Sequence, residues 1–184
     1  MSAVAAILLT ADEFMCLPNP TNGSQQELVQ GEVTTMPPPK ARHGIICSQI
    51  NWLLRSFVAP RRLGWVTSND TGFILERNPD TVRGPAVAYW SIVRQPQLPE
   101  HYFDIPPDLL VEVQSPDDRR RDVREKVRTY VAAGVPLAWL VDPDTRTVTV
   151  YAGSLRGLEL DETDTLDGGT ILPGFNTLVA AIFD

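Results

Sequence analysis

Cysteine is scarce in this chain of 184 residues, which contains only Cys16 and Cys47. Two cysteines are too few for a disulfide framework, and neither has the CxxC spacing of a zinc or redox site. No apolar run approaches the roughly 20 residues that a membrane-spanning helix needs. Residues 3–9 are apolar, but no Lys or Arg precedes them and Thr10 follows directly, so we expect no signal peptide. These absences predict a cytoplasmic protein with no membrane partner and with two buried thiols.

Excess positive charge is also absent, because 16 Lys and Arg face 23 Asp and Glu, for a net charge of -7. This balance argues against general, charge-driven adhesion to nucleic acid or anionic lipid. Arginines do gather locally, and Arg119 and Arg120 stand at the start of a predicted helix. They could contact nucleic acid, or they could form a solvated face paired with nearby acids at helical spacing.

The chain has the length and composition of one globular domain, residues 1–184, in which residues 1–23 form an N-terminal extension. Thr10 with Glu13 predicts a capping box that opens a short helix. Apolar residues at helical spacing predict a second, longer helix that Pro60 ends. Between the two helices, residues 27–36 predict a hairpin that turns at Gln30-Gly31.

The remaining segments predict an α/β fold with a central mixed sheet flanked by helices. Residues rich in Val, Ile and aromatics predict strands that form one continuous sheet, over 64–67, 71–75, 85–90, 109–113 and 137–141. A helix capped by Ser115 or Asp117 and ended by Gly134 connects the last two of these strands. Its inner stripe should consist of Val123, Val127, Tyr130 and Val131. Such a connection predicts a right-handed parallel crossover. Alternating Val148 and Val150 then predict a hairpin after it.

Glu112 stands inside an otherwise apolar strand, between Val111 and Val113. Burying an ionised carboxylate is costly unless a cation or hydrogen bonds compensate it, so Glu112 predicts a metal ion or a buried partner. Side chains alternate along a strand, so Glu112 and Gln114 should share one face.

Several segments, taken in order, resemble the Uma-two family, which is restriction-endonuclease-like and belongs to the PD-(D/E)XK nuclease superfamily. The matching pieces are Glu27-Leu28-Val29-Gln30-Gly31-Glu32, His43, Thr71-Gly72-Phe73, Gly84-Pro85, residues 111–116, Lys126, residues 130–136 and residues 139–143. The resemblance runs from about residue 24 to the C-terminus. It implies a restriction-endonuclease-like core with a central four-stranded mixed sheet, preceded by an N-terminal hairpin extension. It also implies hydrolysis of DNA phosphodiesters with Mg2+ or Mn2+, and nucleases that cut both strands are commonly homodimers.

The resemblance also assigns roles to individual residues. Glu112 matches the metal-binding glutamate, and Gln114 stands where the superfamily motif has a lysine. Lys126 on the following helix replaces that lysine, unless it only pairs with Asp122 one turn earlier. Ala86 stands where the pattern has the second metal-binding residue, an aspartate. A methyl group cannot bind a cation, which fits either a natural member that has lost this aspartate or a deliberate replacement.

Other residues carry weaker signals. By the resemblance, Glu27 matches an acid that faces the nuclease site. The alternative role for Glu27 is a solvent-facing charge at the edge of a sheet. His43 fits a helix start or a packing role, with a phosphate contact as the alternative. The acids near turns and prolines are expected to be solvated loop residues, namely Asp70, Asp80, Asp104 and Asp108.

The sequence therefore leaves three hypotheses. The first is a metal-dependent endonuclease that is inactive as written because Ala86 replaces the expected aspartate. The second is a non-catalytic module on the same fold that binds nucleic acid or protein. The third is a hydrolase unrelated to nucleic acid that uses Glu27 and Glu112 as a carboxylate pair.

Overall fold

The computed structural model describes residues 8–115 and 120–184 of the chain. Within these residues the main sheet has six strands, in the order β10-β9-β8-β7-β6-β3. They are β3 (Gly64–Ser68), β6 (Val87–Ser91), β7 (Leu109–Val113), β8 (Leu137–Asp142), β9 (Thr147–Ala152) and β10 (Leu158–Leu160). β7 and β8 run parallel, as predicted, whereas the other neighbouring pairs run antiparallel. The sheet is therefore mixed, but it has six strands instead of the expected four.

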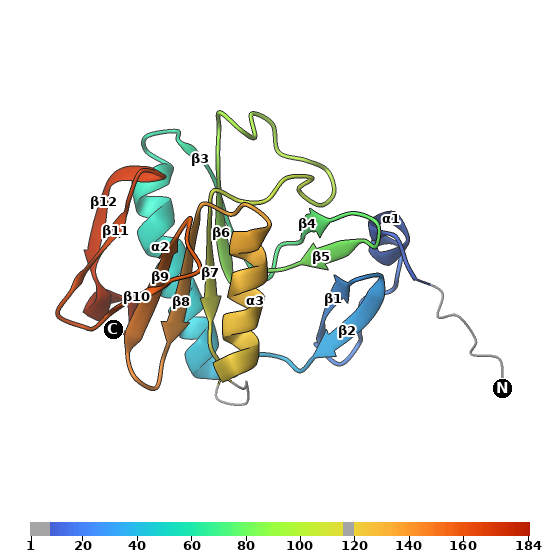
Figure 1. Cartoon of the computed structure of the whole chain (residues 1–184), viewed down its shortest axis with the longest axis horizontal. Coiled ribbons are helices and arrows are strands. Elements are labelled where there is room, and N and C mark those ends of the chain that lie inside the picture. Colours follow the sequence, from blue (N-terminus) through green and yellow to red (C-terminus); the bar gives the residue numbers. More distant parts are fainter. Residues whose placement is uncertain (1–7, 116–119) are drawn as a thin grey trace.

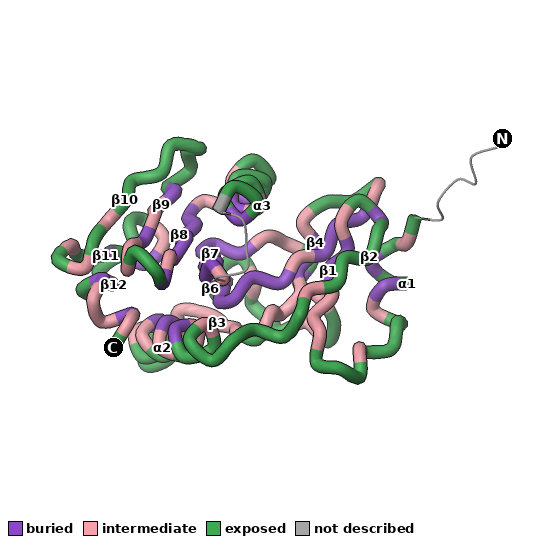
Figure 2. Tube along the Cα trace, turned by 90° about the horizontal axis from the view of Figure 1, so that it is seen from below, coloured by how far each residue is buried: buried purple, intermediate pink, exposed green. Residues whose placement is uncertain are grey.

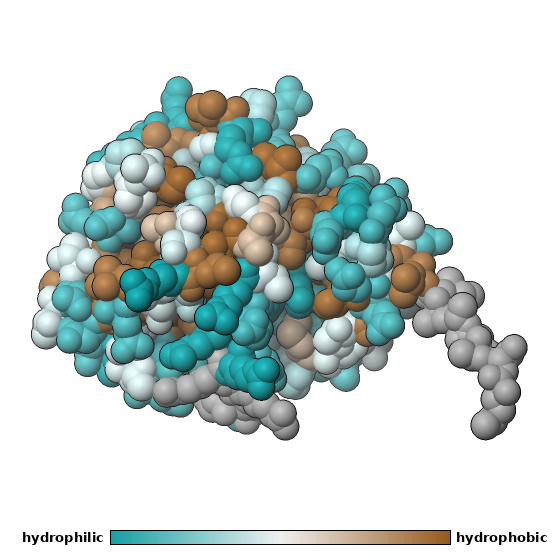
Figure 3. Space-filling model, viewed as in Figure 1, coloured by the Kyte–Doolittle hydropathy of each residue, from teal (hydrophilic) through white to brown (hydrophobic). Residues whose placement is uncertain are grey.

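Helices cover both faces of this sheet: α2 (Ala41–Val58) packs on one face and α3 (Arg120–Ala132) on the other (Figure 1). Figure 2 shows the buried strands β6, β7 and β8 between the two helices. Alternation along β7 sends Val111 into the cluster on the α2 side and Leu110 into the cluster on the α3 side. The inner stripe predicted for α3 is confirmed by the burial of Val127 and Tyr130. Hydrophilic side chains gather over the outward-facing lower end of α3 (Figure 3).

A second sheet has the strand order β2-β1-β5-β4. Its members are β1 (Gln25–Val29), β2 (Glu32–Met36), β4 (Phe73–Glu76) and β5 (Thr81–Arg83). The β1–β2 hairpin is confirmed, and it turns at Gln30 and Gly31 with positive φ values of 52° and 79°. The prediction of one continuous sheet is wrong, because β4 pairs with β5 and not with the main sheet. The prediction lacked β5, whose three residues show too little periodicity to identify a strand.

The C-terminal part of the chain completes the core on the α2 side of the main sheet. It consists of β11 (Thr165–Gly168), β12 (Leu172–Leu178) and a 3-10 helix (Val179–Ile182). Leu166, Leu172 and Phe175 join the same buried cluster as the inner face of α2. The cavity described below is lined by the start of α2, by α3 and by the second sheet.

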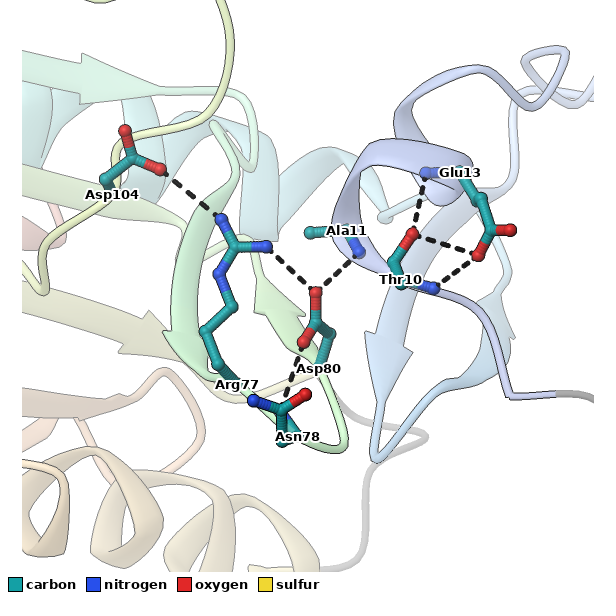
Figure 4. Close-up of polar contacts among 7 residues, drawn as sticks. All are labelled: Thr10, Ala11, Glu13, Arg77, Asn78, Asp80 and Asp104. Carbon is teal, nitrogen blue, oxygen red and sulfur yellow. Dashed lines mark hydrogen bonds and ion pairs between the residues drawn. The ribbon is translucent and has the colours of Figure 1, made fainter.

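The short helix α1 (Ala11–Met15) is stabilised by its own capping box and by a distant side chain, Asp80. The predicted capping box is present, with the Thr10 side chain accepting from the Glu13 N–H at 3.2 Å. Asp80 then accepts hydrogen bonds from the Ala11 N–H at 2.8 Å and from Arg77 Nη1 at 2.9 Å (Figure 4). The hydrogen bond from the Ala11 N–H is the largest cause that lowers the pKa of Asp80, and the bond from Arg77 also lowers it. Asp80 is thus a buried anchor for α1, and the prediction of a solvated loop acid is wrong.

Other predictions about single side chains have mixed outcomes. Asp108 was also expected to be a solvated loop residue, but it is buried. Its carboxylate accepts from the Ser91 N–H at 2.7 Å and from Arg94 Nη1 at 2.9 Å. The expectation of two buried thiols is wrong for Cys16, which is exposed, while Cys47 is half-buried. Burial raises the pKa of Cys47 to about 12, so this thiol is not a reactive thiolate.

Across residues 8–115 and 120–184, no helix is both long enough and apolar enough to cross a membrane.

Candidate functional site

A cavity of about 670 Å³ opens between α3, the second sheet and the segment that links β2 to α2. Five of the residues that the sequence singled out line it together: Glu27, His43, Ala86, Glu112 and Lys126. They come from β1, α2, the start of β6, β7 and α3. The fold therefore brings most of the predicted site residues to one place, although they are far apart in the sequence.

Glu112 lies on the α3 side of β7 and is only 8% exposed. Its Oε1 accepts a hydrogen bond from the Tyr130 hydroxyl at 2.8 Å and lies 3.0 Å from Lys126 Nζ. The predicted compensation for a buried carboxylate is therefore present, and it is an ammonium group together with a phenol.

Lys126 extends from α3 between two glutamates. Its Nζ lies 3.0 Å from Glu112 Oε1 and 3.0 Å from Glu27 Oε1. Burial opposes the charge of this ammonium, but the two carboxylates outweigh it and raise the pKa of Lys126. The ammonium is therefore protonated at neutral pH. Within the described part of the chain, it pairs with these glutamates and not with Asp122, the alternative partner that the sequence allowed.

Glu27 is 3% exposed, so the alternative of a solvent-facing edge charge is wrong. Its Oε2 accepts from Arg83 Nη1 at 2.7 Å, and its Oε1 accepts from the Gly84 N–H at 3.0 Å. Burial opposes ionisation, but Lys126, Arg83 and the Gly84 N–H outweigh it and lower the pKa of Glu27. Glu27 is thus ionised, and one ammonium group joins it to Glu112.

Ala86 directly precedes β6 and is 4% exposed. The next residue, Val87, pairs with Val111 of β7, so Ala86 lies beside the strand that carries Glu112. Ala86 lines the same cavity as the two glutamates, and it also belongs to the buried cluster on the α2 side. The position at which the resemblance places an aspartate therefore faces the site, but it supplies no oxygen ligand.

Asp70 also lines the cavity, although its sequence predicted a solvated loop acid. It follows β3 with a left-handed φ of 53°, and the Gln25 side-chain amide donates to its carboxylate. A Cβ at Gly84 would lie 2.4 Å from the Asp70 carbonyl oxygen, so only glycine allows the two backbones to pack this closely. Burial, followed by repulsion from Glu112, raises the pKa of Asp70 to about 6. That prediction is wrong because the fold moves this loop against the distant Gly84.

The remaining predicted residues lie elsewhere or outside the described residues. Gln114 does not share the cavity with Glu112, since it lines a separate small hollow with Arg124 and Asp142. Arg119 and the side chain of Arg120 lie outside the described residues, as does the possible cap Asp117. Arg124 of α3 and Leu140 of the α3-side cluster line the small hollow too, so Gln114 shares the sheet face of Glu112, as predicted, but not its cavity.

His43 lies in the first turn of α2 and lines the cavity. Its Nδ1 lies 3.4 Å from Cys47 Sγ, one helical turn later. The structure therefore places it at a helix start, as predicted, and also within reach of a ligand in the cavity.

Arg83 was not singled out by the sequence, yet it binds Glu27 and lines the cavity. The only sequence signal was its position just before Gly84-Pro85. The pairing of Leu28 with Val82 brings β1 beside β5, so that Glu27 meets Arg83.

The divalent ion that the resemblance implies does not fit the residues present. Glu27 is held on both oxygens by Arg83, Gly84 and Lys126, and Ala86 offers no ligand. Among the described residues, no group of three or more His, Cys, Asp or Glu side chains is arranged to hold a metal ion. Divalent sites of this kind rely on several oxygen ligands. The cation between the two glutamates of this cavity is Lys126 Nζ.

Comparisons with known proteins agree with the resemblance seen in the sequence. A family model described as "Putative restriction endonuclease" matches residues 11–181. A solved structure, described as "a putative nuclease belonging to DUF820" from Anabaena variabilis ATCC 29413, is 23% identical over 95% of this chain and 97% of that chain, with a TM-score of 0.81. At this identity the likeness shows the fold. No curated protein matches the chain. Because the family model covers almost its whole length, the chain belongs to the Uma2 family, which is described as "Putative restriction endonuclease".

Proposed function

We propose that the cavity is a phosphodiester-hydrolysing site of the nuclease type that lacks one metal ligand, so that the chain as written does not cleave DNA. The observation that carries this proposal is the place of Ala86. Ala86 lines the cavity that holds Glu27, Glu112 and Lys126, and it lies beside the strand of Glu112. A single side-chain change therefore separates this cavity from one with the full acidic set.

The charges of the cavity support the loss of activity. Hydrolysis of a phosphodiester builds negative charge at phosphorus, which must be neutralised by cations. Lys126 and Arg83 already neutralise Glu27 and Glu112, whereas Asp70 adds a further carboxylate. The cavity as written thus has no spare positive charge for the developing anion among these residues.

The proposal predicts that Ala86→Asp produces nicking of supercoiled plasmid in the presence of Mn2+, while the unchanged chain produces none. An oxygen ligand at position 86 would complete the acidic set beside Glu112. Nicking is measured on agarose gels as the loss of supercoiled DNA with time, and circular dichroism checks that each variant is folded.

Two matched variants serve as controls. Ala86→Asn adds a side chain of the same shape without the charge, and we expect no nicking from it. Ala86→Asp combined with Glu112→Ala should lose the nicking that Ala86→Asp alone produces. If folded Ala86→Asp is as inactive as this double variant, the hydrolase proposal fails.

A second candidate function is a non-catalytic module that binds nucleic acid or a protein partner. The favouring observation is that the network of Glu27, Arg83, Lys126 and Glu112 closes without a metal ion. A cavity whose carboxylates are neutralised by its own lysine and arginine can keep a binding role after catalysis is lost. Binding that persists with a steep salt dependence while Mn2+ is not bound would favour this candidate.

A further inference from the structure

The two glutamates of the cavity are buried. Glu27 and Glu112 are 3% and 8% exposed, so a phosphate can reach them only from inside the cavity. A volume of about 670 Å³ is within the range of small-molecule pockets, which is about 300 to 1,000 Å³. A double helix, whose major groove is already about 12 Å wide, is too large to enter such a space. A single strand is small enough to enter this space, and so is one nucleotide drawn out of a duplex.

One wall of the cavity suits the sugar and base of a nucleotide better than its phosphate. It is formed by Met36 and the exposed prolines Pro37, Pro38 and Pro39, which present apolar surface to the cavity. Proline rings fix their own backbone φ, so this wall needs little ordering when a ligand packs on it.

A basic end follows this wall directly. Lys40 is the N-cap residue of α2, and Lys40 and His43 both line the cavity. The first turn of α2 contains no acidic residue, and the N-terminal end of a helix of 18 residues favours negative charge. The cavity thus offers the Lys40 ammonium and the start of α2 beside its apolar surface, while its acidic lining consists of Glu27, Asp70, Glu112, Asp122 and Glu125.

We propose that this cavity takes a single-stranded segment of nucleic acid, with a sugar and base packed on Pro37–Pro39 and a backbone phosphate at Lys40 and His43. This inference rests on the proposed function, because it names the substrate class of the same cavity. The preference follows from the size of the cavity, the apolar wall and the charge at its end, and it requires no metal ion.

The test measures binding by the unchanged chain in the presence of EDTA. The probes are fluorescently labelled single-stranded DNA and RNA of about 12 nucleotides, within the site sizes of single-strand grooves, and a blunt DNA duplex of equal length. Fluorescence anisotropy should show at least about tenfold tighter binding of a single strand than of the duplex. The tighter binder of the two single strands shows whether the cavity prefers DNA or RNA. Equal binding of strand and duplex, or no binding of any probe, overturns the inference.

Matched variants locate the binding. Lys40→Gln removes the charge at the basic end, and it should weaken single-strand binding several-fold and reduce the slope of log affinity against log salt by about 1. Arg156→Gln removes an exposed charge in a residue that does not line the cavity, and it should change neither quantity. Equal effects of the two variants overturn the inference.

A cleavage experiment separates this inference from the proposed function. If Ala86→Asp cuts single strands or unpaired flaps faster than duplex, both stand. If it cuts blunt duplex equally fast, the hydrolase proposal stands and the single-strand inference falls. If it cuts nothing, the hydrolase proposal falls, and the EDTA binding experiment alone decides whether the cavity takes a single strand.

Discussion

Replacing Lys126 by methionine should lower the free energy of unfolding by about 3 to 5 kcal/mol, the usual cost of removing one partner of a buried ion pair. The ammonium lies 3.0 Å from Glu27 and 3.0 Å from Glu112, and both carboxylates are buried. Without it, Glu112 retains the Tyr130 hydroxyl and Glu27 retains Arg83, but two negative charges face each other across the cavity. The loss is measured by urea unfolding at neutral pH.

The sequence provides a matched control, because Lys40 is the only other lysine. Lys40 is exposed, and Lys40→Met should change the stability by no more than about 0.5 kcal/mol. Adding Glu112→Gln to Lys126→Met should recover part of the stability, since it removes one of the uncompensated charges. Equal losses in the two lysine variants would show that Lys126 is not the buried bridge described here.

The effect of Lys126→Met should also depend on pH. The pKa of Glu27 is lowered in the folded protein, so its ionisation stabilises the fold above its ordinary pKa of about 4.3. That stabilisation is lost as the pH falls through the lowered folded pKa. Because Lys126 is a principal cause of the lowering, the stability difference between the unchanged chain and Lys126→Met should shrink in acid.

Replacing Gly84 by alanine should destabilise the protein by about 1 to 3 kcal/mol or more, through overpacking against backbone. A Cβ at this position would lie 2.4 Å from the Asp70 carbonyl oxygen and 2.9 Å from the Asp70 carbonyl carbon. The backbone has to move to relieve this contact, and the Gly84 N–H then moves away from Glu27. The measurement is again urea unfolding.

Gly44→Ala is the matched control for this change. Gly44 lies in α2, and nothing lies within 4 Å of its added Cβ. Alanine in place of a helical glycine should stabilise by about 0.5 to 1 kcal/mol. The two glycine variants should therefore change stability in opposite directions, and a neutral Gly84→Ala would contradict the close packing of Asp70 on this part of the cavity.

Local sequence patterns predicted much of the fold. The hairpin at Gln30-Gly31, the capping box at Thr10 and the inner stripe of α3 depend on neighbouring residues, so their chemistry is visible in the sequence. The pairing of strands is set by contacts between distant segments. For this reason β4 was assigned to the wrong sheet, and the six-strand width of the main sheet was not foreseen.

In the candidate site, too, features set by neighbouring residues were predicted, and features set by distant contacts were not. Glu112 was identified because a carboxylate in an apolar strand is unusual in any sequence, and its burial confirms that part of the prediction. Asp70 and Arg83 were missed, because nothing near them in the sequence indicates the fold that brings them to the cavity. Strand periodicity placed Gln114 on the face of Glu112, but it could not show that the cavity ends before Gln114. The roles of Glu27, Ala86, Glu112 and Lys126 in catalysis stay predictions.

The claim that position 86 is the missing metal ligand is tested most directly by calorimetric titration of Mn2+ into three proteins. These are the unchanged chain, Ala86→Asp, and Ala86→Asp combined with Glu112→Ala. We predict saturable binding heat for Ala86→Asp, and none for the other two. Mn2+ binding by the unchanged chain that equals binding by Ala86→Asp would contradict the account.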